Sequence, residues 1–186
     1  MGLGSYWGEV IDVLRDIIPV YDKVNSFISL GKDTEHRNRA ISGRINKGDK
    51  VLDAGSGFGN MSKTASKIVG NDLDLILYDP LMPMLKNTDR LFDTKLDSAC
   101  GVFEHIPFQN DEFDMVLSGY SLRDAISLKT AISEIHRVLK KNGTAVIGVY
   151  YYNFILRNWS ILQPFVNSIS YLQPNLKGRG RGAVSY

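Results

Sequence analysis

Residues 51–59 read VLDAGSGFG, an apolar run that leads directly into a turn in which three glycines alternate. Glycine adopts left-handed backbone conformations without strain and lets a ligand come close to the main chain. The same glycines also suit a tight strand-to-helix turn that binds nothing. The stretch therefore predicts a strand followed by a tight turn, and its surroundings decide whether the turn holds a ligand.

Strands alternate with helical patterns along most of the chain. Each predicted strand is a short apolar or β-branched run bounded by glycine, aspartate or proline. The five runs are Lys50–Ala54, Leu73–Tyr78, Asp97–Gly101, Phe113–Ser118 and Ala145–Tyr150. The clearest helical pattern is Ser127–Lys141, whose apolar residues recur at helical spacing, and Asn142-Gly143 predicts its C-terminal stop.

This alternation predicts an α/β fold. Near-continuous apolar strands separated by amphipathic helices indicate a mostly parallel central sheet with helices on both faces. Ligands of such sheets bind beyond the carboxyl ends of the strands. We expect one structural domain with three parts: an N-terminal helical segment (residues 1–45) that forms a lid or substrate wall, the ligand-binding core (46–150), and a C-terminal helical segment with a flexible basic tail (151–186).

Composition narrows the class of protein. The chain has 186 residues, 44% of them hydrophobic, which suits a single domain with its own core. Its one cysteine, Cys100, cannot form an intrachain disulfide and is expected to be a small core residue, so a cytoplasmic location is predicted. The longest apolar run, Thr144–Leu156, is too short to span a membrane. A net charge of +2 gives no reason to expect nucleic acid.

A carboxylate ends the second predicted strand, at Asp79, about one strand-helix-strand unit after the glycine turn. There it can accept hydrogen bonds from both hydroxyls of a ribose. It can also cap the helix that follows, with Pro80 at the first helical position. Together with the glycine turn, the ribose interpretation is favoured. A turn that binds NAD would carry its third glycine at position 60, where this chain has Asn60, so NAD is the weaker expectation.

The acidic residue two places before the first glycine, followed by Gly-x-Gly-x-Gly, is similar to the first motif of the Rossmann-like methyltransferases that use S-adenosylmethionine. More narrowly, residues 21 to about 150 resemble the UbiE-like C-methyltransferases of ubiquinone and menaquinone biosynthesis. The matching segments are Tyr21-Asp22-Lys23-Val24-Asn25, Ser29-Leu30-Gly31, residues 101–108, 111–116 and 120–124, and Glu134–Lys140. The resemblance implies S-adenosylmethionine as the cofactor and S-adenosylhomocysteine as the product.

The resemblance also implies a set of site residues. Those expected to bind the cofactor are Asp53, Gly55, Gly57, Gly59, Asp79, Pro80, Val102, Phe103 and Ser118. Those expected to polarise or face the methyl acceptor are Arg123, Asp124 and Tyr21, together with Asn25, His36 and Arg37. Arg123 could equally form a surface salt bridge, and Tyr21 a packed aromatic contact. No metal is expected, because the three histidines and the cysteine lack the spacing of metal ligands.

Departures from the family bear on specificity. Val102 stands where the family usually has an acidic residue beside the adenine amino group, so an adenine contact there would come from the backbone, such as the Phe103 N–H. His36 replaces a tryptophan and Asp124 an asparagine, both in regions expected to face substrate. Family members normally continue past position 186 into two further strands. Those terminal strands of the usual seven are expected to be missing here, either because the sheet is truncated or because the sequence is incomplete.

The function that these observations predict is methyl transfer from S-adenosylmethionine to a carbon of a small aromatic or quinol acceptor. Because the transfer is an in-line displacement, the protein's main tasks are to align the acceptor and exclude water. The sequence identifies no general base. Two alternatives stay open: a methyltransferase for another small molecule, and a module that binds S-adenosylmethionine without turnover.

The aromatic segment that follows the last predicted strand has three interpretations. Its residues are expected first to be core, and otherwise to line an acceptor pocket or a dimer face. They are Tyr150-Tyr151-Tyr152, Phe154-Ile155-Leu156 and Trp159. A homodimer and transient contact with a membrane surface therefore both stay open. The expected partner is a small-molecule acceptor and not a nucleic acid.

Overall fold

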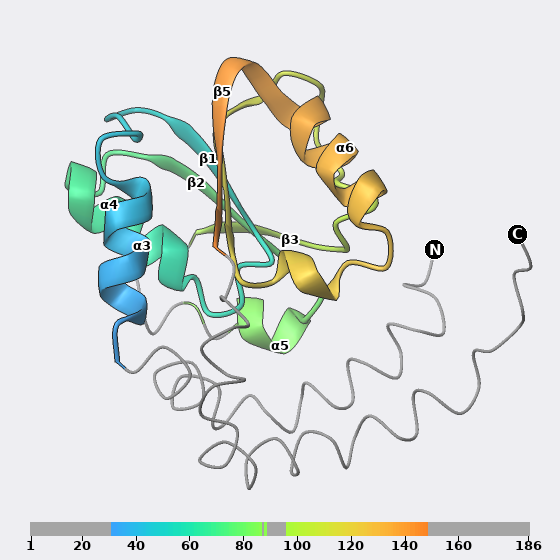
Figure 1. Ribbon diagram of the computed structural model, residues 1–186, viewed down its shortest axis with the longest axis horizontal. Coiled ribbons are helices and arrows are strands. Elements are labelled where there is room, and N and C mark those ends of the chain that lie inside the picture. Colours follow the sequence, from blue (N-terminus) through green and yellow to red (C-terminus); the bar gives the residue numbers. More distant parts are fainter. Residues whose placement is uncertain (1–30, 87, 89–95, 149–186) are drawn as a thin grey trace, which may run out of the picture. The chain divides into compact units, whose positions relative to one another are not determined.

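A parallel sheet is the centre of the described structure. The computed structural model describes residues 31–86, 88 and 96–148. The strands of the sheet are β1 (Lys50–Ala54), β2 (Asp74–Asp79), β3 (Asp97–Cys100), β4 (Phe113–Gly119) and β5 (Leu139–Gly148), in the order β3-β2-β1-β4-β5 (Figure 1). Every neighbouring pair is parallel, so the predicted α/β class with a parallel sheet is confirmed.

The strand order changes direction at β1. The chain runs from β1 to β2 and β3 on one side, and then returns to place β4 and β5 on the other side. Where successive connections leave a central strand in opposite directions, a crevice opens at the carboxyl ends of the strands, and α/β proteins bind ligands there. The glycine turn follows β1, so the fold places it at this switch point.

Helices cover both faces of the sheet (Figure 1). The helices α3 (Asp33–Ile41) and α4 (Asn60–Val69) pack on one face and α6 (Leu128–Val138) on the other, while the short α5 (Met82–Leu85) contacts β2 and β3. Alternate strand residues point to opposite faces. Val51 and Met115 therefore join the core under α3 and α4, and their neighbours Leu52 and Val116 join the core under α6.

The predicted boundary between the last helix and the last strand is wrong. The helix ends at Val138, three residues before the prediction, because Leu139 is already extended and pairs with Phe113. The strand β5 thus begins six residues earlier than expected. Asn142 has a φ of 68°, as its turn signal suggested, but it belongs to an irregularity between the pairs Phe113–Leu139 and Met115–Thr144 and not to a helix stop.

Two smaller expectations are also wrong. Cys100 is exposed at the end of β3 and not part of the core, and its thiol donates to the Pro80 carbonyl at 3.4 Å. Pro80 is not the first helical residue, because α5 begins at Met82 and Pro83 takes the proline position of its first turn. Cys100 lies on β3, which is the end strand of the described sheet, and α5 begins two residues after Pro80.

Charged side chains join the strands at their amino ends. The Lys50 ammonium lies 2.8 Å from Glu112, and the Lys140 ammonium lies 2.8 Å from Asp114. Asp114 also accepts the Lys50 N–H at 3.0 Å. These four residues, here called the amino-end cluster, connect β1, β4 and β5 at the end of the sheet opposite the glycine turn.

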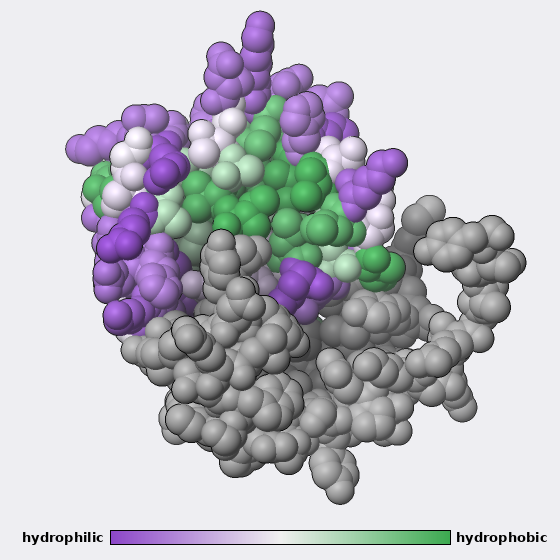
Figure 2. All heavy atoms as spheres, in the orientation of Figure 1, coloured by the Kyte–Doolittle hydropathy of each residue, from purple (hydrophilic) through white to green (hydrophobic). Residues whose placement is uncertain are grey.

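One face of α6 exposes apolar side chains in addition to those that it buries. Figure 2 shows apolar surface over α6 and β5. Leu128 and Ile132 on α6 and Ile147 on β5 are exposed, and so is His136 on α6. A shallow pocket on this helix is lined by Leu128, Lys129, Ile132, Ser133 and His136.

The remaining sequence expectations about organisation lie partly outside the described residues. The structure does not describe four of the features that the sequence analysis named. They are Tyr21, Asn25, the aromatic segment from Tyr150 onward and most of the predicted N-terminal segment. The described part of that segment contains α3. None of the helices in the described ranges is long and apolar enough to cross a membrane.

Candidate functional site

The turn after β1 needs its glycines for conformational reasons. Gly55, Gly57 and Gly59 all have positive φ, at 68°, 55° and 81°. Gly59 is also the left-handed N-cap residue of α4. A side chain at Gly55 would collide with its surroundings, because a Cβ there would lie 2.1 Å from the Ser121 hydroxyl oxygen. The turn therefore brings main chain from the end of β1 directly against the segment that follows β4, which only a glycine allows.

Asp79 joins the end of β2 to the glycine turn. One carboxylate oxygen accepts the Gly57 N–H and the other accepts the Leu81 N–H, each at 2.8 Å. The side chain is 5% exposed. Asp79 thus presents a carboxylate beside the glycines, whereas the alternative that it caps the next helix is wrong, because Leu81 is the N-cap of α5 and no described side chain caps that helix. Each oxygen keeps a lone pair beyond the bond it makes.

Asp53 lies beneath the turn, fully buried. One of its oxygens accepts both the Ser62 N–H at 3.0 Å and the Ser62 hydroxyl at 2.7 Å, which fixes the start of α4 to β1. Among the described residues, its other oxygen and the Ser56 hydroxyl are buried without a hydrogen-bond partner. Buried polar atoms are normally paired. These two atoms therefore favour a polar group or an ordered water at the turn.

Both carboxyl groups have raised pKa values. Burial raises the pKa of Asp53 to about 6; the hydrogen bonds from Ser62 oppose this, the Asp79 charge adds to it, and the Arg37 charge reduces it. Burial likewise raises the pKa of Asp79 to about 6, against the Leu81 and Gly57 N–H bonds and with a contribution from Asp124. The site therefore holds two coupled carboxyl groups that titrate just below neutral pH.

These pKa values predict a dependence of stability on pH. Below about pH 4 the Asp53 carboxyl is protonated in the folded and the unfolded chain alike. Between about pH 4 and 6 the unfolded chain releases this proton while the folded chain keeps it, so the free energy of unfolding falls as pH rises. The Asp53→Asn variant keeps an amide oxygen for Ser62 but cannot ionise. We expect the stability of wild type relative to this variant to fall by roughly 3 kcal/mol across the window.

Urea unfolding of both proteins at several pH values measures this difference. Asp97→Asn, which changes an exposed carboxylate on the edge strand β3, is the control and should leave the pH dependence of wild type in place. Parallel curves for wild type and Asp53→Asn would contradict a raised pKa at Asp53.

The residues predicted to face the acceptor divide between buried and exposed. Arg37 on α3 is 7% exposed and pairs with Asp33 one turn earlier, and its charge reaches Asp53 and Tyr120. The next residue back, His36, is exposed. Arg37 thus lies within electrostatic reach of the glycine turn, packed against the protein, whereas His36 faces outward.

Arg123 and Asp124 lie on a short 3₁₀ turn after β4, Leu122–Asp124. They form an ion pair with each other at 3.5 Å, and both are about half exposed or more. The Asp124 charge nonetheless acts on Asp79, which places this turn beside the ribose candidate. Burial raises the pKa of Asp124, while Arg123 opposes that shift. Arg123 and Asp124 therefore form a salt bridge on the surface and also lie at the mouth of the candidate site.

Ser118 marks the end of β4 beneath the glycine turn. It is fully buried, and its hydroxyl lies 3.2 Å from that of Ser121, which in turn donates to the Ala54 carbonyl at 3.3 Å. The two serines thus link the carboxyl ends of β1 and β4 on the switch-point side of the sheet.

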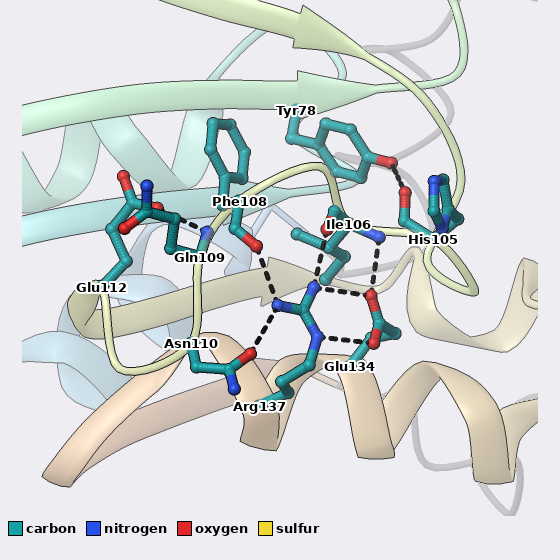
Figure 3. A network of polar contacts seen from close by, with 9 residues as sticks. All are labelled: Tyr78, His105, Ile106, Phe108, Gln109, Asn110, Glu112, Glu134 and Arg137. Atoms are coloured by element: carbon teal, nitrogen blue, oxygen red, sulfur yellow. Dashed lines mark hydrogen bonds and ion pairs between the residues drawn. The ribbon is translucent and has the colours of Figure 1, made fainter.

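The loop after β3 carries the two residues predicted to lie at the adenine. Val102 is partly buried, and the Phe103 side chain is buried with its ring tip 3.0 Å from where a Cβ of Gly55 would lie. Residues 101–112 are fastened to α6 by Arg137, which binds Glu134 through two nitrogens and donates to the carbonyls of Ile106 and Phe108 (Figure 3). Val102 and Phe103 are therefore held next to the glycine turn.

Several residues around the site have a role that the sequence did not predict. Ser62 and Ser121 gave no signal, because an isolated serine is compatible with almost any surface position. Arg137 lies in a stretch that matches the family, and Tyr78 in a predicted strand, but neither was assigned a role. The glycines and the carboxylates, in contrast, were visible because each ends an apolar strand.

The strand order, the glycine turn after β1 and the carboxylate at the end of β2 define the Rossmann-like fold of S-adenosylmethionine-dependent methyltransferases. A solved structure with this fold, a proposed S-adenosyl-L-methionine-dependent methyltransferase from Methanococcus maripaludis, matches with a TM-score of 0.59 over 92% of this chain and 84% of that one, at 20% identity. The model of the ubiE/COQ5 methyltransferase family matches residues 5–159, so this chain belongs to that family.

Curated relatives carry the same family name. The ubiquinone/menaquinone biosynthesis C-methyltransferase UbiE of Coxiella burnetii is 30% identical over 151 residues, covering 75% of this chain and 58% of that protein. The Neisseria meningitidis protein of the same name is 31% identical over 144 residues, covering 75% and 59%. The resemblance identified from the sequence is thus confirmed. The chain spans somewhat less than three fifths of the length of these relatives.

Proposed function

We propose that this chain binds S-adenosylmethionine and transfers its methyl group to a carbon of a small aromatic or quinol acceptor. The observation that carries the proposal is the hydrogen bond from the Gly57 N–H to Asp79. It joins the carboxylate at the end of β2 to the left-handed glycine turn that follows the neighbouring strand β1. Membership of the ubiE/COQ5 family supports the reaction type. The names of the relatives in Coxiella and Neisseria support a quinol as acceptor.

The described residues fit an adenosyl ligand. Asp79 has free lone pairs for ribose hydroxyls, and the three positive-φ glycines place no side chain between the main chain and a ligand. The buried Asp53 oxygen and Ser56 hydroxyl offer unsatisfied polar atoms at the same turn. Pro80, Val102, Phe103 and Ser118 come from the neighbouring strand ends. The bound cofactor supplies a methyl group on a positively charged sulfur, and the protein aligns it and keeps water away.

The acceptor is proposed to meet the residues after β4 and the N-terminal segment. Arg123 and Asp124 offer a cation and a carboxylate at the mouth of the site. An acceptor hydroxyl near this pair would lose its proton more easily, which makes the adjacent ring carbon more nucleophilic. Tyr21, Asn25 and His36 stay candidates for closing over the acceptor, with residues 1–45 as the lid. A cytoplasmic location also stays a prediction.

The cofactor site is tested with two variants. Gly57→Val places a β-branched residue at a φ of 55°, and Asp79→Ala removes the carboxylate beside the turn. Because hydrogen bonds to a charged group contribute about 1.5–3 kcal/mol, we expect each variant to bind S-adenosylmethionine and S-adenosylhomocysteine at least tenfold more weakly. Calorimetric titration measures the affinities, with NAD as a ligand that wild type should not bind.

A matched control separates backbone strain from loss of the site. Gly70→Val makes the same substitution at a glycine with a φ of 74° and nothing within 4 Å of its Cβ position, at the far end of α4. It should cost stability but keep affinity. Undiminished affinity in both Gly57→Val and Asp79→Ala would contradict the proposed cofactor site.

A second candidate function is methylation of a different small molecule. Asp124 and the exposed His36 favour it, since both depart from the family pattern in the region that faces the acceptor. Acceptor-dependent formation of S-adenosylhomocysteine distinguishes the candidates. Turnover with a prenylated hydroquinone supports the quinol acceptor, turnover only with other phenols supports the second candidate, and binding without turnover supports a non-catalytic module.

A further inference from the structure

The peptide between Val102 and Phe103 is fixed at one end. The Val102 carbonyl accepts a hydrogen bond from the Tyr78 hydroxyl at 2.8 Å and another from the His105 N–H at 3.1 Å. The described residues contain no cis peptide bond. In a planar trans peptide the C=O and the following N–H point in opposite directions. The two bonds to the Val102 oxygen therefore direct the Phe103 N–H away from Tyr78.

The Tyr78 hydroxyl has little freedom to move. Tyr78 is 1% exposed, on β2, and its ring packs edge-on to Phe108 with the ring centroids 6.2 Å apart. Its oxygen also lies 2.8 Å from the His105 carbonyl (Figure 3). A Cβ at Gly101 would lie 2.2 Å from this oxygen, so the absence of a side chain there leaves room for the hydroxyl.

The Phe103 N–H lies beside the candidate cofactor site. The residue before Val102, Gly101, donates its own N–H to the Asp79 carbonyl at 3.2 Å, and the Phe103 ring reaches the Gly55 position. Within the described ranges, no carbonyl or side chain accepts a hydrogen bond from the Phe103 N–H. The Phe103 N–H is thus an available backbone donor on the loop that is hydrogen-bonded, through Gly101, to Asp79, the proposed ribose-binding residue.

We infer that Tyr78 is a positioning residue for adenine recognition: its hydroxyl orients the Val102–Phe103 peptide so that the Phe103 N–H donates to a ring nitrogen of the adenine. This inference rests on the proposed function. The side chain at position 102 is apolar and cannot bind the adenine amino group, so on the described loop after β3 the Phe103 N–H is the donor that we assign to the base. A donor of fixed direction discriminates better than a mobile one, because no ordering cost opposes the bond.

The test removes only the hydroxyl, in Tyr78→Phe. S-Adenosylhomocysteine and three analogues, in which N1, N3 or N7 of the adenine is replaced by C–H, are titrated into both proteins. Wild type should bind one of the analogues about tenfold more weakly than the parent ligand. Tyr78→Phe should bind the parent about five- to tenfold more weakly than wild type and should distinguish that analogue by less than about twofold.

Thr88→Val is the matched control. The Thr88 hydroxyl is also buried and donates to a carbonyl, that of Leu85 at 2.7 Å, so its loss has a similar cost in stability. This variant should keep the tenfold discrimination. If Tyr78→Phe also keeps it, or loses affinity equally for the parent and every analogue, the inference is overturned. If wild type fails to bind S-adenosylhomocysteine at all, the proposed function itself fails.

A second measurement needs no variant. In ¹⁵N-labelled wild type, the Phe103 amide proton should shift downfield when S-adenosylhomocysteine binds, and less so with the discriminated analogue. An unchanged Phe103 amide resonance, while the Gly55 and Gly57 amides shift, would overturn the inference even if Tyr78→Phe did not fold.

Discussion

The Gly55→Ala variant is expected to lose about 2–5 kcal/mol of its free energy of unfolding and to bind S-adenosylhomocysteine at least a hundredfold more weakly. Two effects add. A left-handed conformation costs a residue with a Cβ roughly 1–2 kcal/mol, and forcing an atom into a filled space costs roughly 1–3 kcal/mol. The new methyl group would lie 2.1 Å from the Ser121 hydroxyl oxygen and 3.0 Å from the Phe103 ring. Relieving these contacts moves both the glycine turn and the loop after β3, and affinity falls accordingly.

Gly43→Ala separates the two effects. Gly43 has a φ of 74° and nothing within 4 Å of its Cβ position, so this variant carries only the conformational cost. It should lose roughly 1–2 kcal/mol of stability with unchanged affinity. Urea unfolding and calorimetric titration give both quantities. A Gly55→Ala variant that behaves like Gly43→Ala would show that the close approach at Ser121 has no consequence.

The Arg137→Met variant is expected to be the most damaging change away from the turn, with a loss of about 2–3 kcal/mol of stability. The Arg137 guanidinium lies 2.7 and 2.8 Å from the two oxygens of Glu134. It also donates to the Ile106 carbonyl at 2.7 Å, the Phe108 carbonyl at 2.8 Å and the Asn110 side chain at 3.0 Å. Methionine keeps the aliphatic stem but leaves these acceptors without their donor.

The loss should depend on pH. Arg137 lowers the pKa of Glu134 below its usual value of 4.5. The stability from this pair is therefore complete above that value and is lost as pH falls through the lower, folded-state pKa. The difference between wild type and Arg137→Met should shrink correspondingly in acid. Arg39→Met is the control, because Arg39 is 81% exposed and its pair with Glu35 spans 3.4 Å. Equal losses in the two variants would mean that the bonds to the loop contribute nothing.

The strands and the first glycine turn could be predicted because their signals are local. An apolar run of five residues that ends at an aspartate or a glycine identifies itself without reference to the rest of the chain. The beginning of β5 could not be predicted in this way. Lys140, Lys141 and Asn142 are polar because that part of an edge strand faces solvent, so they read as the end of a helix. Only the pairing of Leu139 with Phe113 shows that the chain is already extended there.

The residues of the candidate site likewise divide into those with a local signal in the sequence and those whose role depends on contacts in the folded chain. Asp53 and Asp79 follow from their places at strand ends, whereas Ser62 and Ser121 matter through contacts that the fold creates. Arg37 illustrates the limit most clearly. The resemblance implies that it faces the acceptor, and α3 packs on the sheet with Arg37 buried beside Asp33 and within electrostatic reach of Asp53. Which side of a short helix faces the sheet is set by its neighbours, and the sequence of α3 is too polar to reveal it.

The amino-end cluster has a practical consequence for every measurement described above. Lys50 begins β1 and the glycine turn follows its end, and a strand of this length spans about 16 Å. A fluorescent dye, a spin label or a surface tether attached near Lys50, Glu112 or Lys140 therefore stays clear of the ligand while remaining on rigid framework. Binding can then be followed on immobilised protein without disturbing the end of the sheet where the chemistry is proposed to occur.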